Sequence, residues 1–482
     1  MVFRSRSSGS IFSRVNRFDF DLAVIGGGSS GFAAARTAAA AGLKGAVIEG
    51  GKEVGGLCIL RGCMPTKALL YAADVIHLTR HAGTWGIRSP EVGFDFAQVM
   101  ARKNALIKEF ADERVHQLTS GKFRFIRAPA WFSDSHTVVL GSGETLTAGH
   151  FIISTGSVVS APPLLQLQEI GYLTSDEALG LTQPPQSLIV LGGGPVAVEF
   201  AQFFARFDTK VTIIQRSEHI LRDFDTDAAA ELEKVFRREG LAVHTATRLV
   251  DAWRDGALKG VTFQHEGKTL RVAAEEILFA LGRSPNTAGL HLERAGVRTE
   301  QQRIVVNAQM QTRAPHIYAA GDCTGPHEIV HIAVQQGEIA AHNIAHPDKP
   351  RSIDYRLLTS VVFTDPQIGC VGLTEKEARA RDIPYLASSY PFGDHGKSLI
   401  MEATDGFVKL LADPSSGEIL GGCCVGTMGS ELIHEIIAAM ANRMTVHALA
   451  AMPHYHPTLA EIWTYPAEKL AEKIPIRLPQ SA

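Results

Sequence analysis

"FDFDLAVIGGGSSGFAAARTAAAAGLKGAVIEG", residues 18–50, is the stretch that decides the fold. An apolar strand at 22–25 leads into Gly26-x-Gly28-x-x-Gly31, an alanine-rich helix follows, and a second strand ends at Glu49. Such glycines permit a tight turn and let a pyrophosphate approach the backbone at the helix N-terminus. Glu49 stands where an acid can bind a ribose hydroxyl. The stretch therefore predicts a dinucleotide-binding βαβ unit.

The pattern recurs at residues 187–225, where the loop reads Gly192-x-Gly194-x-x-Ala197 and the second strand spans 211–214. Gln215 replaces the ribose acid, and Arg216 and Arg222 follow it. Without a carboxylate to repel it, a 2′-phosphate can bind the two guanidiniums. The alternative is that both arginines are ordinary solvated surface charges. The sequence favours NADPH over NADH.

Two dinucleotide sites in one chain suggest a flavin in one and a nicotinamide in the other. Three further strand ends fit this interpretation. Thr155-Gly156 and Gly282-Arg283 read as crossing points between domains, and Asp322 follows an apolar strand where an acid could hold a flavin side chain.

Composition narrows the class of protein. The chain has 482 residues, enough for two to four domains. A net charge of -3 gives no electrostatic reason to expect nucleic acid or an anionic membrane as a partner. Six cysteines are too few for a secreted disulfide scaffold, so we expect a reducing compartment, the cytoplasm by default. No apolar run is long enough to span a bilayer.

Residues 1–18 are rich in Arg and Ser and contain no acid. They are predicted to be a short disordered leader. An organelle transit peptide, and hence an organelle matrix, is the alternative.

Cys58 and Cys63 lie in "GGLCILRGCMPTKALL", residues 55–70. Structural zinc needs a second ligand pair, which the spacing of the other cysteines does not offer, so no metal site is predicted. Considered in isolation, the two thiols could be small apolar side chains in a hydrophobic core, but a neighbouring flavin favours a redox pair. Residues five apart in one helix have Cα atoms roughly 8 Å apart, beyond the reach of a disulfide. We therefore predict a break in the helix, marked by Gly62 and Pro65.

Taken together, these residues resemble the class I pyridine nucleotide–disulfide oxidoreductases. The family includes dihydrolipoamide dehydrogenases, glutathione reductases and mercuric reductases. The resemblance extends from about residue 19 to 461 through both glycine loops, the Cys58-x4-Cys63-x-Pro65-x-Lys67 motif and "HYHPTLAE" at 454–461. It implies an α/β fold with two Rossmann-like domains, one for FAD and one for NAD(P), and a C-terminal α+β dimerisation domain. The implied bounds are 19–160 with 287–355 for FAD, 161–286 for NAD(P), and 356–482 for the interface.

The resemblance also implies residue roles. Cys63 faces the flavin and Cys58 attacks the substrate disulfide. His456, oriented by Glu461, is the base, and the pair reaches the disulfide of the partner subunit in a homodimer. Lys67 and Glu199 pair beside the flavin; read without the family, each would be an exposed helix charge.

The implied reaction passes electrons from NAD(P)H through FAD and the Cys58–Cys63 disulfide to a small disulfide, or runs in reverse with a dithiol such as dihydrolipoamide. A mercuric-reductase-like activity is an alternative. However, mercuric reductases usually carry a second cysteine pair near the C-terminus, and the last cysteine of this sequence is Cys424. A non-catalytic flavoprotein scaffold of a multienzyme complex is another. The adjacent residues Cys423 and Cys424 are expected to pack in the hydrophobic core, on a strand that leads into a helix.

Overall fold

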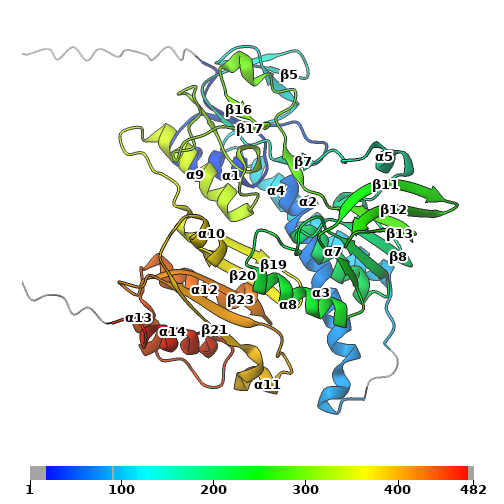
Figure 1. The fold of residues 1–482 in the computed structure, drawn as a ribbon. Coiled ribbons are helices and arrows are strands. Elements are labelled where there is room, and N and C mark those ends of the chain that lie inside the picture. The colour runs from blue at the N-terminus through cyan, green and yellow to red at the C-terminus, as the bar shows by residue number, and fades with distance from the viewer. Residues whose placement is uncertain (1–17, 89–91, 476–482) are drawn as a thin grey trace, which may run out of the picture. The chain divides into compact units, whose positions relative to one another are not determined.

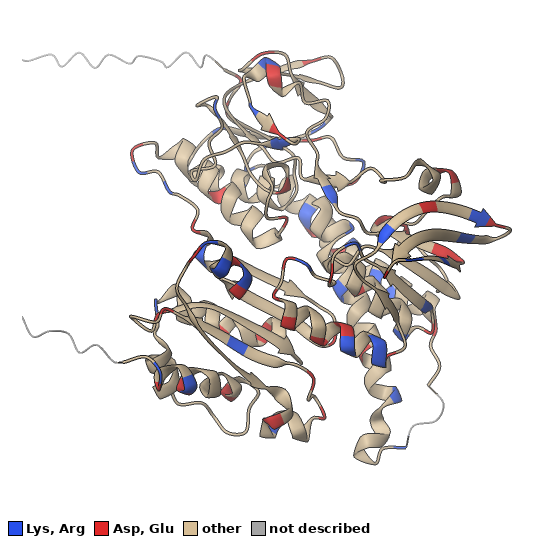
Figure 2. Ribbon diagram, in the orientation of Figure 1, with Lys and Arg blue, Asp and Glu red and all other residues tan. Residues whose placement is uncertain are grey.

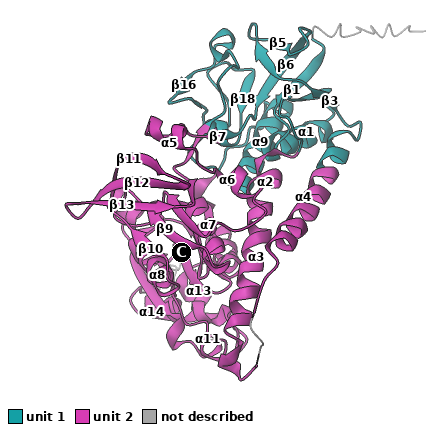
Figure 3. Cartoon of the chain, turned by 90° about the vertical axis from the view of Figure 1, so that its right-hand side faces the viewer, with its two compact units in different colours: residues 1–54, 114–157, 285–353 teal, residues 55–113, 158–284, 354–482 magenta. Residues whose placement is uncertain are grey.

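The computed structural model describes residues 18–88 and 92–475 (Figure 1). The chain divides into two compact units (Figure 3). Unit 1 runs to residue 54 and adds 114–157 and 285–353, whereas unit 2 comprises 55–113, 158–284 and 354–482. Lys and Arg alternate with Asp and Glu along surface helices such as α10 (Glu375–Ala380) (Figure 2). In the described ranges, no helix combines the length and apolar character that a bilayer crossing requires.

Unit 1 is built on a largely parallel sheet in the order β3-β2-β1-β6-β5-β4, with β18 also pairing with β6. Helices α1 and α9 pack against each other beside the apolar strands of this sheet. The core includes Leu22, Val24, Val47 and Ile152. Its elements are β1 (Phe20–Ile25), α1 (Ser29–Ala40), β2 (Gly45–Glu49), β3 (Arg124–Arg127), β4 (Ala130–Phe132), β5 (Thr137–Leu140), β6 (Thr145–Ile153), η2 (Leu292–Ala295), β16 (Thr299–Glu300), β17 (Arg303–Ile304), β18 (Ile317–Ala319), η3 (Asp322–Thr324) and α9 (Val330–Ala345).

Within unit 2, residues 158–284 repeat this plan. A parallel sheet in the order β10-β9-β8-β14 is accompanied by the antiparallel sheet β11-β12-β13. The elements are α5 (Leu165–Ile170), α6 (Ser175–Ala178), β8 (Ser187–Leu191), α7 (Pro195–Arg206), β9 (Lys210–Ile214), α8 (Thr226–Arg238), β10 (Ala242–His244), β11 (Arg248–Asp255), β12 (Leu258–His265), β13 (Lys268–Ala274) and β14 (Glu276–Phe279). In both sheets a glycine loop follows the strand where the order reverses, which is where open α/β sheets bind ligands.

Residues 55–113 belong to unit 2 because their helices share its core. Leu69, Leu70 and Ile76 of α3 pack with Phe200 and Phe203 of α7 in one hydrophobic cluster. The elements here are α2 (Gly56–Leu60), α3 (Cys63–Arg80), η1 (Ala82–Trp85) and α4 (Phe96–Leu118), the last of which crosses into unit 1.

The C-terminal part of unit 2 is an antiparallel sheet in the order β19-β20-β23-β22-β21, with α12 against β20 and β23 and α14 against β21. Cys423 and Cys424 are buried on β23, which leads into α12, as predicted. The elements are η4 (Tyr355–Leu357), β19 (Thr359–Val362), β20 (Gln367–Gly372), α10, β21 (Leu386–Pro391), η5 (Phe392–Asp394), α11 (Gly396–Ile400), β22 (Phe407–Ala412), β23 (Ile419–Gly426), α12 (Gly429–Ala441), α13 (Val446–Ala451), η6 (Ala460–Trp463) and α14 (Thr464–Ala471).

The boundaries between the units at 157/158 and 284/285 fall within two short paired strands, β7 (Ser157–Val159) and β15 (Arg283–Pro285). They lie near the expected limits of the inserted NAD(P) segment. The division differs from the expected three domains in that 55–113 groups with unit 2, and the NAD(P) and interface segments form one unit. The predicted leader falls, apart from residue 18, outside the described residues.

Candidate active site

The first glycine loop has a backbone that only glycine tolerates. Gly26 has φ +106°, and a Cβ there would lie 2.3 Å from the carbonyl oxygen of Ser154. A Cβ on Gly31 would lie 1.9 Å from the Gly26 oxygen. Glu49 turns toward the loop, where its Oε2 accepts a hydrogen bond of 2.8 Å from the Gly27 N–H. The predicted strand, loop and acid are therefore assembled as a single cradle at the end of β1.

Gly28 is the N-cap of α1, and no acidic side chain occupies the first turn of this helix. The helix N-terminus can therefore receive a phosphate. Thr155 and Gly156 follow β6, the strand next to β1, and Gly156 has φ +71°. Asp322 accepts a hydrogen bond of 2.7 Å from the Ser157 hydroxyl. The glycine loop, the N-terminus of α1 and the carboxylates of Glu49 and Asp322 together have the chemistry needed to bind a dinucleotide such as FAD.

The second loop repeats the first. Gly192 has φ +115°, and a Cβ there would lie 2.4 Å from the carbonyl oxygen of Ala280, whereas Gly194 is the N-cap of α7 with open space around it. Gln215 is buried, and its side chain lies beside Gly193, where a Cβ would approach it to 3.0 Å. Gln215 thus occupies the place that Glu49 holds in unit 1, without the charge.

The other predicted coenzyme residues surround this loop. Ala197 is buried in the first turn of α7. Arg216 and Arg222 are both exposed, and Arg222 Nε lies 3.5 Å from an Asp223 oxygen. Gly282 has φ +112°, and Arg283 is half-buried on β15. Both arginine side chains are therefore accessible to a phosphate.

Cys58 and Cys63, the predicted redox pair, lie on different helices, as predicted. α2 ends at Leu60, and α3 begins at Cys63. Gly62 lies in the break with ψ −114°, and a Cβ there would lie 3.0 Å from the Leu57 oxygen. Both cysteines carry free thiols in this structure. The break brings Cys58 within hydrogen-bonding reach of Cys63, which one continuous helix would not do.

The surroundings of Cys63 stabilise its thiolate. A hydrogen bond from the Cys58 thiol is the main cause that lowers the pKa of Cys63 from 9.0 to about 7, against the opposing effect of burial. The positive charge of Lys67 lowers this pKa further, and the carboxylate of Glu199 raises it. Cys63 is also the first residue of α3, where the helix dipole favours negative charge. A substantial part of Cys63 is therefore ionised near neutral pH.

Lys67 and Glu199 form an ion pair in which the ammonium group contacts both carboxylate oxygens. Lys67 Nζ lies 3.0 Å and 2.8 Å from the two carboxylate oxygens of Glu199, whose side chain is 4% exposed. The backbone N–H of Phe363 donates a third hydrogen bond of 3.0 Å to Glu199, and the Phe363 ring lies 4.5 Å from Lys67 Nζ. No sequence motif singles out Phe363, because it contributes a backbone group.

His456 and Glu461 are adjacent, as the resemblance implied. His456 Nδ1 lies 3.0 Å from Glu461 Oε2. The side chain of His456 is 78% exposed and that of Glu461 only 10%. Because Nδ1 is turned to the carboxylate, Nε2 is presented outward. A third residue, His395, lies 3.3 Å from the other oxygen of Glu461. Sequence reasoning missed it, since no motif links it to Glu461.

One group in the described part of the chain has the spacing of metal ligands, namely His77, Glu239 and Asp365, with ligand atoms within 4.8 Å of one another. However, the buried guanidinium of Arg206 already lies 2.8 Å from Glu239 and 2.7 Å from Asp365 and Asp74. Burial and then the charge of Arg206 lower the pKa of His77 to about 4. Both carboxylates of the group already bind the Arg206 guanidinium, so we assign no metal here.

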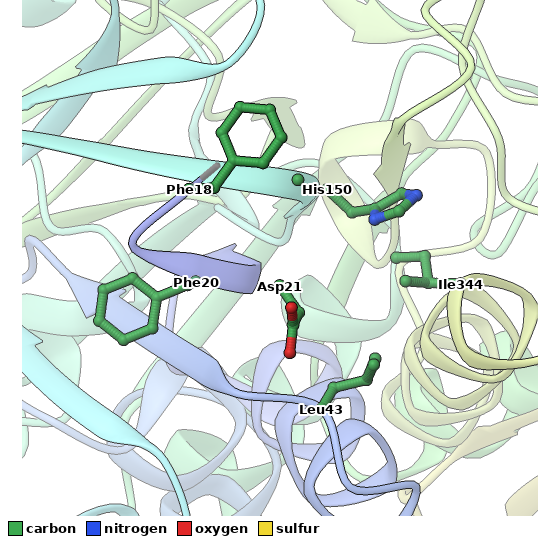
Figure 4. Close-up of a pocket in the computed structure, with 7 residues that line it drawn as sticks. Phe18, Phe20, Asp21, Leu43, His150 and Ile344 are labelled. Atoms are coloured by element: carbon green, nitrogen blue, oxygen red, sulfur yellow. The ribbon is translucent and has the colours of Figure 1, made fainter. Parts of the chain in front are cut away.

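A separate pocket of about 220 Å³ lies in unit 1, lined by Phe18, Phe20, Asp21, Leu43, Gly149, His150 and Ile344 (Figure 4). The Asp21 carboxylate accepts a hydrogen bond of 2.8 Å from the Lys44 N–H. Burial lowers the pKa of His150. None of the predicted site residues lines this pocket.

The chain is similar to proteins of known function. Residues 20–337 match the pyridine nucleotide-disulphide oxidoreductases, and residues 358–467 match the dimerisation domain of these proteins. The chain belongs to the pyridine nucleotide-disulphide oxidoreductase family.

Relatives span nearly the full chain. The dihydrolipoyl dehydrogenase of Bacillus subtilis is 34% identical over 457 residues, which cover 92% of this chain and 96% of the relative. Mercuric reductase of Streptomyces lividans is 36% identical over 449 residues, with 92% and 94% covered. The solved structure of the HOCl-induced flavoprotein disulfide reductase RclA from Escherichia coli has a TM-score of 0.82 at 27% identity, with 93% of this chain and 99% of that chain covered.

Membership of the family confirms the predicted fold class and reaction class. This oxidoreductase is a flavoprotein that couples a nicotinamide coenzyme to a dithiol–disulfide pair. The match to the dimerisation domain supports a homodimer. FAD, when bound, supplies the two-electron step between the nicotinamide and the cysteines.

Proposed function

We propose that this oxidoreductase uses NADPH to reduce a small-molecule disulfide through Cys58 and Cys63, or oxidises a small dithiol in reverse. The observation that carries the proposal is the helix break at Gly62, which brings the two thiols together and leaves Cys63 with a pKa of about 7. A pair of buried filler thiols would need neither the break nor the lowered pKa.

The sulfur exchange uses only the thiols of Cys58 and Cys63 and the substrate disulfide. The Cys58 thiolate attacks one sulfur of the substrate disulfide, so that a mixed disulfide forms and one substrate thiolate leaves. The Cys63 thiolate then attacks the Cys58 sulfur, and the second substrate thiolate leaves as the Cys58–Cys63 disulfide forms. Two protons complete the two product thiols. The low pKa of Cys63 supports its assignment as the thiolate that remains beside the flavin, with Cys58 as the thiol that exchanges.

We assign the proton transfers to His456, oriented by Glu461. The carboxylate fixes the ring with Nδ1–H inward and can stabilise the imidazolium that forms when Nε2 takes the Cys58 proton. The 78% exposure of His456 supports a role outside its own subunit, at a disulfide of the partner. In this proposal an isolated monomer is inactive.

The coenzyme preference rests on Gln215 and on the two exposed arginines, Arg216 and Arg222. A buried amide beside the loop does not repel a 2′-phosphate as a carboxylate would, and the arginines supply positive charge nearby. The proposed assignment of segments follows, with 19–160 and 287–355 for FAD, 161–286 for NADPH and 356–482 for the interface.

The decisive experiment is a turnover screen of the FAD-loaded protein with NADPH and NADH against lipoamide, glutathione disulfide and Hg(II). We expect turnover of at least one disulfide, and anaerobic two-electron reduction should produce the long-wavelength absorbance of a thiolate beside the flavin. Loss of this absorbance in Cys63→Ser, but not in Cys424→Ser, assigns it to the redox pair. Folded, FAD-loaded protein with neither turnover nor absorbance would be a scaffold, and the proposal would fail.

Mixing of inactive subunits tests the shared site. In a hybrid of His456→Ala and Cys58→Ser subunits, one site combines an intact Cys58 with an intact His456 from the partner. Random exchange makes half of the dimers hybrids with one of two sites intact, so we expect about a quarter of wild-type activity to return. If the base acted within its own subunit, no site in the hybrid would be complete and nothing would return.

Hg(II) reduction is the alternative activity, and the mercuric reductase of Streptomyces lividans, 36% identical, is the observation that favours it. In the screen, rapid Hg(II)-dependent NADPH oxidation without disulfide turnover would select it. The proposed compartment is the cytoplasm, since six cysteines are too few for a secreted disulfide scaffold. Fractionation of cells that express the full chain tests this assignment.

A further inference from the structure

The carboxylate of Glu461 lies between two imidazoles. One is the exposed ring of His456, whose Nδ1 lies 3.0 Å from Oε2. The other is the ring of His395, which is 0% exposed and whose Nε2 lies 3.3 Å from Oε1. His395 precedes α11, and Glu461 lies in η6, so the contact joins segments that are far apart in the sequence.

The hydrogen-bonding partners of His395 determine which of its nitrogens carries the proton. Nδ1 lies 2.8 Å from the hydroxyl of the buried Ser398. If Ser398 donates to Nδ1, then the neutral ring carries its proton on Nε2, toward Glu461. The opposite tautomer would turn a nitrogen lone pair toward a carboxylate, and the two would repel each other.

The charged and titratable groups around His395 support a neutral ring that donates to Glu461. Burial lowers the pKa of His395; the carboxylate of Glu461 raises it, and His456 lowers it again. The rings of Tyr465 and Phe392 lie edge-on to His395 with centroids 6.2 Å and 6.5 Å away. Nε2 is not aligned for a full hydrogen bond in this structure and has no other hydrogen-bond partner among the described residues. A buried N–H without a partner is costly, so Glu461 is the acceptor that it needs.

We propose that His395 is a positioning residue that holds the Glu461 carboxylate in the orientation that binds His456. The inference rests on the proposed role of His456 as the base. A donor at Oε1 stabilises the ionised carboxylate, whose side chain is only 10% exposed, while His456 Nδ1 faces both oxygens, 3.2 Å from Oε1 and 3.0 Å from Oε2. Ser398, His395, Glu461 and His456 then form one chain of polar groups from the interior to the exposed Nε2.

Two substitutions of similar size separate this role from simple packing. The amide nitrogen of Gln overlays Nε2 of a histidine, whereas that of Asn overlays Nδ1. His395→Gln therefore keeps a donor toward Glu461, and His395→Asn removes it. We expect His395→Asn to lower kcat for disulfide turnover about tenfold or more, with KM for the disulfide and the rate of flavin reduction by NADPH unchanged. His395→Gln should stay within about threefold of wild type.

His454 provides the matched control, because its side chain is only 7% exposed and also faces a carboxylate, with Nε2 2.7 Å from Glu435 Oε1. His454→Asn should leave kcat within about threefold of wild type. Equal kcat for the Gln and Asn variants of His395, with FAD content as a check of folding, would overturn the inference, and so would equal loss in His395→Asn and His454→Asn. If His456→Ala itself turned over disulfide normally, the proposed base would be wrong instead.

Discussion

Lys67 Nζ lies 2.8 Å from Glu199 Oε2, and this ion pair joins the helix that begins at Cys63 to the helix that begins at the second glycine loop. The lysine is one turn away from the cysteine on α3, and the glutamate is 4% exposed on α7. The helix that carries Cys63 and the helix that follows the second glycine loop are therefore linked electrostatically as well as by packing. A change at this pair should alter the ionisation of Cys63.

Lys67→Met should raise the pKa of Cys63 from about 7, because the lysine charge favours the thiolate and the remaining Glu199 charge opposes it. A thiol is ionised above its pKa, so less thiolate is present at pH 7 in the variant. The measurement is the long-wavelength absorbance of the two-electron-reduced protein as a function of pH. Its midpoint should lie near 7 in the wild type and higher in the variant. Lys108→Met, at a lysine 74% exposed on α4, should not move the midpoint.

Gly192→Ala and Gly194→Ala should have different effects. Gly192 has φ +115° and no room for a Cβ, so its substitution should lower the free energy of unfolding by roughly 1–3 kcal/mol. Gly194 has φ −79° and open space, so alanine should change stability by less than about 1 kcal/mol. The added methyl group should instead hinder the pyrophosphate and raise KM for the coenzyme. Denaturant unfolding and steady-state kinetics measure the two effects, and equal destabilisation would contradict this account of the loop.

Arg206→Met should be strongly destabilising, because it leaves Asp74, Glu239 and Asp365 close together without their cation. We expect the free energy of unfolding to fall by about 2–4 kcal/mol. This loss is smaller than that for breaking a fully buried ion pair, because the side chains of Asp74 and Asp365 are 43% and 40% exposed. Burial already raises the pKa of Asp74 to about 6. The deficit should therefore grow between pH 5 and pH 7, as this carboxyl ionises. Arg443→Met, at a surface pair with Glu418, should cost less than about 1 kcal/mol. A pH-independent deficit would show that lost packing, rather than charge, is responsible.

Replacing both Arg216 and Arg222 by alanine should reduce kcat/KM for NADPH about tenfold or more and leave that for NADH within about threefold. The reason is that only NADPH carries the 2′-phosphate that the guanidiniums are proposed to bind. The Gln215→Glu variant should shift preference in the same direction by adding a repelling charge. A wild-type preference for NADH would show that both arginines are solvated surface charges.

Much of the local structure follows from the sequence because it depends on neighbouring residues. The glycine spacings predicted both βαβ loops, since a positive φ at Gly26 and Gly192 is open to glycine and costly for other residues. The five-residue separation of Cys58 and Cys63 predicted the helix break, because covalent geometry alone excludes a disulfide across one regular helix.

The environment of each functional group depends on contacts between distant segments. The sequence named Lys67 and Glu199 only through a resemblance, and only packing of α3 on α7 brings them into contact. Burial decided that Gln215 lies beside Gly193 while Arg216 and Arg222 remain in solvent. The contact of His395 with Glu461 has no sequence signature at all, since it arises where the start of α11 meets η6 and a polar group excluded from water must find a partner. The sequence by itself determined the turns and the chemistry available; the tertiary structure decided which charges face one another, because burial and distance set the strength of their interaction.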